Sequence, residues 1–327
     1  MTVGTPRWGS SDDVSEGIFN AYVEGGGNFI DTADIYAKGR SEELIGGYIE
    51  ERNLRDRLVL ATKFSFHGGE KGNPNDGGNG RKNMHRGLKG SLRRLKTEYV
   101  DLYWMHVWDG ITPVEEVLQS LDDLVRAGKI RYFGFSDLPA WYATKAATLA
   151  TAHSVPGPIA LQLEYSLVER SIKREHIPSA RECGLGICPW SPLAAGFLAG
   201  KYQRVEKTAT GEGRPSDANP FGDSKFTDRS WRVPDVLKTV AAQVEHPLAQ
   251  VALAWAAAQP GITSFILGAS KLEQLHDNLG SLEIRLSAEQ LKALAEGSAL
   301  DSAFPYGIFT PQVSRMIFGG ATVDGWR

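Results

Sequence analysis

The order of apolar runs and amphipathic stretches constrains the fold most, because the two alternate along almost the whole chain of 327 residues. Strand-like runs are predicted at 28–31, 57–63, 99–106, 129–135, 158–163, 185–189 and 263–267. Helices are predicted at 12–25, 40–52, 82–96, 113–127, 139–152, 172–183, 247–258, 271–279 and 287–296. Strands that are joined through helices form right-handed crossovers, and therefore a parallel sheet of the α/β class.

The number of these strand–helix units favours a closed barrel over an open sheet. The units fill about 280 residues, which suits a single (β/α)8 TIM barrel domain spanning residues 1–327. No G-x-G-x-x-G motif follows a strand, which weighs against an open dinucleotide-binding sheet. Before the helix predicted at 12–25 only residues 1–4, MTVG, are available for a strand, so the first strand is expected to be short or truncated. Either the start of the chain has lost residues, or the barrel is less stable at that edge.

Two long irregular segments are expected on the carboxyl side of the barrel. Residues 66–81 contain many glycines, and residues 202–232 mix Gly, Pro and charged residues with aromatic side chains. Long loops inside a compact fold are usually lids or binding loops, and sometimes disordered. We expect at least one of them to cover the site.

The composition narrows the class of protein. A hydrophobic content of 42% and a charged content of 23% are typical of a globular protein. The net charge of −3 and the lack of a basic block make nucleic acid an unexpected partner. Cys183 and Cys188 stand in no metal-ligand pattern, and no apolar run is long enough for a membrane span. We expect a cytoplasmic protein with no metal; its oligomeric state is left open.

Four polar residues mark the ends of the first predicted strands. Asp31 follows GGNFI, Lys63 follows RLVLAT, His106 follows YVDLYWM, and Tyr36 comes five residues after Asp31. The carboxyl ends of parallel strands meet, so these side chains should lie together. A lysine ammonium lowers the pKa of a nearby phenol, an aspartate holds the lysine, and a histidine can bond a carbonyl oxygen. The set suits carbonyl reduction, with a proton from Tyr36 and a hydride from a nicotinamide.

Each of these residues also has a simpler interpretation. Asp31 could be a helix-capping or turn residue, Tyr36 a surface aromatic, and His106 a histidine satisfied within the core. An unpaired Lys63 at the end of so apolar a strand would be costly. A lyase that uses Lys63 in a Schiff base is a further alternative, but an Asp31 partner argues against it, since a charged lysine is no nucleophile.

Several longer stretches resemble the aldo-keto reductase superfamily. Among them are NFIDTADIY, LVLATKF, SLRRLKTEYVDLYWMH, LQLEYSLVER, CPWSPLAAGFLAGKY and ILGASKLEQLHDNL, in the family's order. The resemblance is greatest to the bacterial and potassium-channel β-subunit-like branches. It implies a barrel in which Asp31, Tyr36, Lys63 and His106 are the catalytic tetrad of an NADP-dependent alcohol:NADP oxidoreductase. It also leaves open an NADPH-binding regulatory subunit with little turnover.

The resemblance further implies residues for the nicotinamide end of a cofactor. Ser136 and Asp137 stand where the family often has Ser-Asn, so Asp137 departs from the pattern and lacks the amide's donor. Gln162 would also hold the carboxamide, and Trp190 would stack on the ring. Trp190 could alternatively be a core residue.

The phosphate end is assigned by the same resemblance. The pyrophosphate loop would be formed by Ser191, Leu193, Gly196 and Lys201. The adenosine 2′-phosphate and adenine would be bound by Ser270, Lys271, Gln274 and Asn278. Lys271 favours NADPH over NADH, although it could be an ordinary first-turn residue. The candidates for a pocket that takes a small carbonyl or alcohol substrate are aromatic, and any of them could be core residues: Trp8, Phe64, Trp108 and Trp231.

Overall fold

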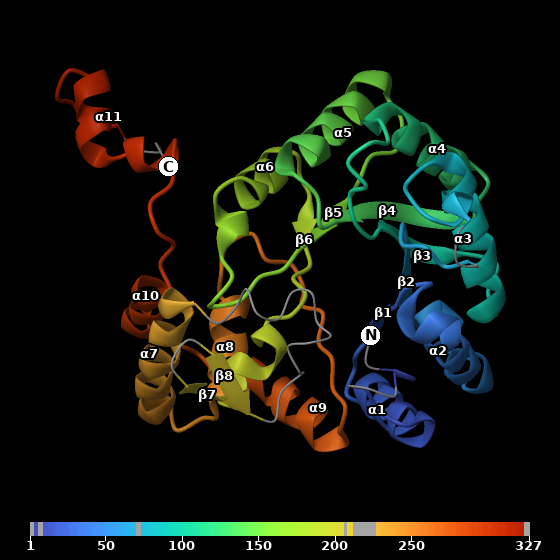
Figure 1. The fold of residues 1–327 in the computed structure, drawn as a ribbon, viewed down its shortest axis with the longest axis horizontal. Helices are drawn as coiled ribbons and strands as arrows, with labels where there is room; N and C mark the ends of the chain where they lie inside the picture. The colour runs from blue at the N-terminus through green and yellow to red at the C-terminus, as the bar shows by residue number, and fades with distance from the viewer. Residues whose placement is uncertain (1–2, 6–8, 70–72, 206–207, 212–226, 324–327) are drawn as a thin grey trace.

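Six parallel strands follow one another in chain order around one curled sheet (Figure 1). The structure is a computed structural model, and it describes residues 3–5, 9–69, 73–205, 208–211 and 227–323. The strands are β1 (Phe29–Asp31), β2 (Val59–Phe64), β3 (Val100–Met105), β4 (Ile130–Ser136), β5 (Ala160–Gln162) and β6 (Gly186–Ile187). The α/β class and the parallel sheet predicted from the alternating pattern are confirmed.

Helices cover the outer face of this sheet (Figure 1). Those between and around the strands are α1 (Asp12–Glu24), α2 (Arg40–Glu51), α3 (Arg81–Arg94), α4 (Val114–Arg126), α5 (Ala140–His153) and α6 (His176–Glu182). The later ones are α7 (Asp228–Val244), α8 (Leu248–Ala257), α9 (Leu272–Leu279), α10 (Ala288–Gly297) and α11 (Pro311–Ile317). In α4, buried residues recur at helical spacing from Val117 to Leu124, so its apolar face packs inward.

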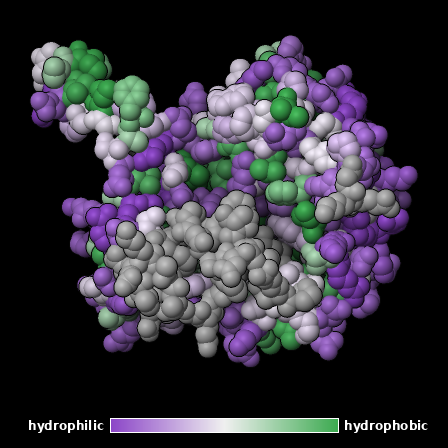
Figure 2. All heavy atoms as spheres, in the orientation of Figure 1, coloured by the Kyte–Doolittle hydropathy of each residue, from purple (hydrophilic) through white to green (hydrophobic). Residues whose placement is uncertain are grey.

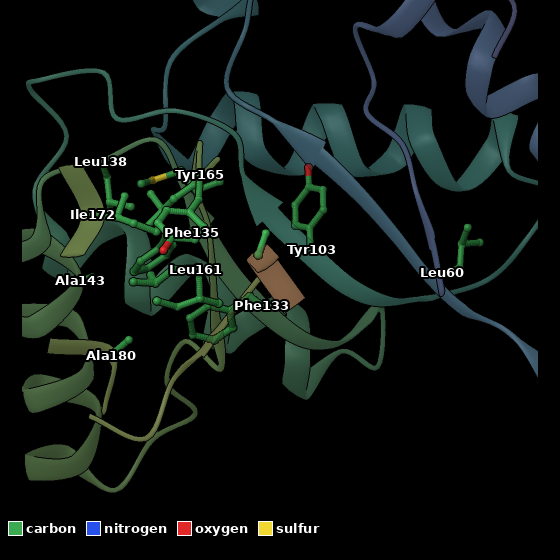
Figure 3. Close-up of a cluster of buried hydrophobic side chains, with 14 of the residues drawn as sticks. Leu60, Tyr103, Phe133, Phe135, Leu138, Ala143, Leu161, Tyr165, Ile172 and Ala180 are labelled. Carbon is green, nitrogen blue, oxygen red and sulfur yellow. The ribbon is translucent and has the colours of Figure 1, made fainter. Parts of the chain in front are cut away.

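The strands bury both faces, which explains their nearly continuous apolar runs. The face toward the helices carries the larger cluster, in which Phe133, Phe135 and Leu161 gather beside α5 and α6 (Figure 3). A second, small cluster holds Ala61, Leu102, Trp104, Ala160 and Cys188. Consecutive residues of one strand belong to different clusters, as Leu60 and Ala61 do in β2. This alternation decides which polar residues can reach the interior.

The closed eight-stranded barrel is only partly reproduced in the described residues. The predicted strand 263–267 is wrong as a strand, but it runs alongside β6, since Thr263 donates its backbone N–H to Ile187 O at 2.8 Å and Ile266 to Pro189 O at 2.9 Å. At the other edge, Val3 makes a single bridge to Ser10 and adds no strand to the sheet. Helix α1 packs on α9 across this side, so helix packing joins the two ends of the curl (Figure 1).

Both segments predicted to be irregular contain regular structure. Residues 66–81 include a short 3-10 turn, Pro74–Asp76, and the first residue of α3. Residues 202–232 include the antiparallel pair β7 (Tyr202–Val205) and β8 (Thr208–Gly211) and the start of α7; residues 212–226 lie outside the described part. Helix α7 has Pro234 in its interior, and an interior proline normally predicts a helix break. The sequence pattern therefore missed this helix.

Candidate active site

Six successive strands each deliver one predicted site residue to the same rim of the sheet. Asp31 ends β1, Lys63 stands one residue before the end of β2, and His106 follows β3. Ser136 ends β4 and Gln162 ends β5, and the two residues are paired in register. Trp190 lies three residues after the end of β6 and forms an isolated parallel bridge with Glu164. The carboxyl ends of parallel strands are where α/β folds build their sites. The structure thus brings together the residues predicted at the strand ends.

Lys63 and Asp31 form a buried ion pair between β2 and β1. The Lys63 side chain is fully buried and Asp31 is 7% exposed, and Nζ contacts Asp31 Oδ2. Lys63 Nζ also donates to Thr32 O at 2.8 Å, while Gln162 Nε2 donates to Asp31 Oδ1 at 3.1 Å. Burial opposes a charged lysine, but the Asp31 carboxylate outweighs it and the pKa of Lys63 is raised. The Asp31 carboxylate therefore favours the charged form of Lys63 at the rim.

Tyr36 lies beside this charge, at the start of the 3-10 turn Tyr36–Gly39. Its Oη is 3.4 Å from His106 Nε2, and Lys63 Nζ is 5.0 Å from the centre of its ring. Burial raises the pKa of Tyr36, and Lys63 lowers it by charge and hydrogen bonding. The net pKa is raised, so the expectation that Lys63 would bring it below its ordinary value is wrong for the protein alone. Tyr36 keeps its proton at neutral pH.

His106 is neutral in this environment. Burial, and then the charge of Lys63, hold its pKa well below the ordinary range for histidine. Its backbone N–H is bonded to Phe64 O at 2.9 Å and lies 3.0 Å from Ser65 Oγ, which fixes the residue at the end of β3. The Phe66 ring meets the imidazole edge-on at 4.8 Å. A neutral imidazole held in this way can offer Nε2 to a substrate oxygen next to Tyr36 Oη.

The proposed nicotinamide end is lined by buried polar groups and one indole. Ser136 is 1% exposed and Gln162 is 3% exposed. Trp190 Nε1 donates to Asp137 Oδ1 at 3.0 Å, and Asp137 adopts the positive φ of 46° that Asp and Asn both tolerate. Burial raises the pKa of Asp137 to about 6, although the Trp190 bond lowers it. Hydroxyl, amide and carboxylate groups beside an indole suit a flat ring that carries a carboxamide.

The residues predicted for the phosphate end lie on two segments next to β6. The 3-10 segment Ala194–Ala199 turns through positive φ at Ala195 and Gly196, and the stem of Lys201 crosses Gly196 so closely that a Cβ would lie 3.2 Å from its Cδ. The φ of 95° at Gly196 favours glycine, because side chains rarely adopt that conformation. The second segment begins after Ile266, whose backbone N–H is bonded to Pro189 O, next to Trp190 in the sequence.

The second segment turns directly into α9. Ser270 donates both its backbone N–H and its Oγ to Gln274 Oε1, at 3.0 and 3.1 Å. Lys271 precedes the first turn of α9 and is exposed, and Asn278 is buried on the last turn. An exposed lysine at a helix N-terminus suits an anionic group. Ser191 and Leu193 lie before the Gly196 turn, both partly buried.

The predicted pocket aromatics are separated in the structure. Phe64 is fully buried and stacks on Tyr103 at 4.9 Å, on the side of β2 toward the helices. Trp231 packs edge-on against Phe197 at 4.9 Å. Trp108 stays near the rim, because its backbone N–H is bonded to Asp137 O at 3.2 Å. Trp8 lies outside the described residues. Of the three described aromatics, Trp108 is placed best to meet a substrate.

Two residues near the site were missed by the sequence analysis. Phe66 was assigned to a loop, yet its ring packs on His106. Asp34 stands two residues before Tyr36, and its Oδ1 is buried without a hydrogen-bond partner in the described part. Burial, together with the nearby charge of Glu42, raises the pKa of Asp34 to about 7. Its only sequence signal was the second aspartate of the DTAD run.

A parallel α/β fold that gathers a buried Lys–Asp pair and a tyrosine at the carboxyl ends of its strands has the arrangement of an α/β enzyme site. Comparison with known proteins is decisive: residues 1–298 match the aldo/keto reductase family, and the chain belongs to it. It is 33% identical over 296 residues to a probable aryl-alcohol dehydrogenase of Saccharomyces cerevisiae, covering 88% of each chain. It is 35% identical over 280 residues to a probable voltage-gated potassium channel subunit beta of Oryza sativa subsp. japonica, covering 85% of each.

A third relative names a cofactor. The aryl-alcohol dehydrogenase [NADP(+)] of Phanerodontia chrysosporium is 32% identical over 305 residues, covering 91% of this chain and 79% of the relative. Within the described ranges, no cluster of three or more His, Cys, Asp or Glu residues could hold a metal ion. None of the helices there is long and apolar enough to cross a membrane.

Proposed function

We propose that the protein is an NADP-dependent oxidoreductase that reduces an aldehyde or ketone to an alcohol, reversibly, with Tyr36 as the proton donor. The observation that carries the proposal is the buried Lys63–Asp31 pair beside Tyr36 and His106. Burying a charged lysine costs free energy of folding even when it is paired. We therefore take the presence of Lys63 here as a sign that the reaction uses its charge.

The four residues divide the work on the carbonyl oxygen. His106 Nε2 and Tyr36 Oη, which are 3.4 Å apart, can both bond that oxygen as negative charge develops on it. Tyr36 then gives up its proton, and the Lys63 ammonium stabilises the phenolate that remains. Asp31 keeps Lys63 charged and in place, and Gln162 orients Asp31. A nicotinamide cofactor supplies the hydride when it is bound.

The cofactor and the substrate class are proposed on less direct grounds. Ser136, Asp137, Gln162 and Trp190 would hold the nicotinamide, and Lys271 favours a 2′-phosphorylated cofactor over NADH. The named relatives include aryl-alcohol dehydrogenases, one of them with NADP(+) in its name. We therefore expect aromatic aldehydes to be reduced better than short aliphatic ones. Both cysteines are free thiols, which agrees with a cytoplasmic location.

Substitution of the proton donor tests the proposal. Tyr36→Phe should lower kcat for a substituted benzaldehyde by about a thousandfold, since general acid catalysis contributes on this scale. The Kd of NADPH, measured by fluorescence quenching, should change less than about twofold. Tyr132→Phe is the matched control because Tyr132 is 57% exposed on β4, and it should leave kcat unchanged. Full turnover by the Tyr36 variant would refute the assignment.

A cofactor-bound regulatory subunit is a second candidate, and the potassium channel relative favours it. In that case the same site would bind NADPH tightly and turn over slowly. A panel of aromatic and aliphatic aldehydes, assayed at saturating NADPH, separates the two functions. Tight binding without turnover across the whole panel would support the subunit.

A further inference from the structure

Asp137 brings a negative charge to the nicotinamide end of the proposed site. Its backbone is fixed just beyond β4, since its N–H is bonded to Gln162 O at 3.3 Å and its carbonyl oxygen accepts the N–H of Trp108 at 3.2 Å. Its Oδ1 accepts the indole N–H of Trp190 at 3.0 Å. These bonds hold the carboxylate at the edge of the Trp190 ring.

No cation in the described part of the chain forms an ion pair with this carboxylate. Lys63 is near enough for its charge to act on Asp137, but it is in contact with Asp31 instead. Burial raises the pKa of Asp137 to about 6 despite the Trp190 bond, and the negative charge of Glu164 adds to that rise. A partly buried carboxylate without a counter-ion is costly, so it would stabilise a cationic ligand beside it.

The position of this charge sets it apart from the charged groups on the outside of the fold. The outer surface over α2, α3 and α4 is mostly hydrophilic (Figure 2). Glu50 near the end of α2 is an example, because its side chain is 59% exposed and pairs with Lys96. Asp137 instead acts on Tyr36, since burial is the main cause of the raised pKa of Tyr36 and the charge of Asp137 adds to it. The carboxylate can therefore influence a charge that develops beside Tyr36.

A nicotinamide would bring the missing positive charge in one of its two redox states. The reduced ring is neutral, whereas loss of a hydride leaves the ring positively charged. The groups around Asp137 fit such a ring, because the buried Ser136 hydroxyl and Gln162 amide can bond a carboxamide and the Trp190 indole offers an aromatic face. A carboxylate at this place distinguishes the two redox states by charge, which an uncharged amide side chain does not do.

We propose that the carboxylate of Asp137 stabilises the oxidised, positively charged nicotinamide relative to the reduced one, and thereby favours departure of the hydride. This inference rests on the proposed function, because it requires a nicotinamide beside Trp190. The hydride, with both electrons of its C–H bond, passes from the ring to the carbonyl carbon, and the proton of Tyr36 passes to the carbonyl oxygen. The positive charge that remains on the ring is the one that Asp137 balances.

Calorimetric titration of the full chain with NADP+ and with NADPH at pH 8 tests the proposal without turnover. The measured quantity is the ratio of the Kd of NADP+ to the Kd of NADPH, because a contact that both cofactors share cancels in it. In Asp137→Asn this ratio should rise about tenfold, since a unit charge near the ring is lost. Asp137→Ser, which removes the charge without adding an amide, should raise the ratio to a similar extent. Glu50→Gln is the control and should leave it unchanged.

The outcomes separate this inference from the proposed function. Binding of both cofactors with a ratio that rises less than about threefold in Asp137→Asn would overturn the role of Asp137 alone. A rise in Asp137→Asn that is absent from Asp137→Ser would assign the effect to the new amide and would also overturn it, as would an equal rise in Glu50→Gln. A wild type that binds neither cofactor would overturn the proposed function as well. Circular dichroism confirms that each variant is folded.

Discussion

Neutralising Asp31 isolates the energetic role of the buried ion pair. In Asp31→Asn the Lys63 ammonium, which is fully buried, loses its carboxylate partner. The asparagine has nearly the same shape, and its oxygen can still accept the Gln162 amide that now bonds Oδ1 at 3.1 Å. The change is therefore electrostatic rather than a loss of packing.

The expected cost follows from the burial of both partners. Removing one member of a buried pair leaves an uncompensated charge and typically costs about 3–5 kcal/mol. The unfolding entropy of a chain of this length is about 0.7 kcal/mol per kelvin, so a loss of about 4 kcal/mol lowers Tm by about 6 °C. The exposed pair Arg52–Glu24, with side chains 35% and 65% exposed, provides the control. Glu24→Gln should cost less than about 1 kcal/mol.

A double-mutant cycle tests the physical reason. Lys63→Met also leaves one charge of the pair unpaired, whereas Asp31→Asn/Lys63→Met leaves neither. Urea unfolding of the cofactor-free protein should show that the double variant loses about 3 kcal/mol less than the sum of the single losses. Additive losses, or a loss below about 1 kcal/mol for Asp31→Asn, would refute the reasoning.

Three further predictions concern packing and pH. Gly46→Ala should destabilise the protein by about 2–4 kcal/mol, because the added Cβ would lie 2.5 Å from Arg94 O. Gly47→Ala on the same helix is the control. Its Cβ would meet nothing within 4 Å, so it should stabilise the protein by about 0.5–1 kcal/mol. The pKa of Asp34 is raised to about 7 in the folded protein, so its protonated form contributes to the free energy of unfolding at low pH. This contribution is lost as the pH rises through 7. Asp34→Asn should flatten that dependence, measured by urea unfolding between pH 4 and 8. The pKa of Asp137 is raised to about 6, so Asp137→Asn should stabilise the protein by about 3 kcal/mol at pH 8 and not at pH 4. An equal gain at both pH values would contradict this cause.

The strand-end residues were predictable because the carboxyl ends of parallel strands converge in any such fold. Asp31, Lys63 and His106 follow apolar runs that could only be strands, and the structure brings them together. The pocket aromatics were not predictable in the same way. Phe64 directly follows Lys63, yet the period of two along a strand sends its side chain to the opposite face. Proximity in the sequence to a buried polar residue such as Lys63 does not show to which face of the sheet a neighbouring side chain points.

Helix α7 and the segment 263–267 show where local pattern fails. Pro234 normally breaks a helix, but packing of α7 against α8 and α10 outweighs this preference. The apolar run 263–267 has the composition of a strand, and it bonds to the edge of β6 without completing a regular ladder. Both outcomes depend on neighbours that are distant in sequence.

By itself, the sequence determined the parallel α/β class and the placement of Asp31, Lys63 and His106 at strand ends, because periodicity and strand ends are local properties. Only the tertiary structure decided the protonation of these residues. Burial raises the pKa of Tyr36 despite Lys63, and it keeps His106 neutral. The Trp190–Asp137 bond and the exposure of Phe304 and Met316 beyond α10 were likewise not predictable from the sequence. Desolvation and packing depend on residues from many parts of the chain, so a local sequence pattern does not predict them.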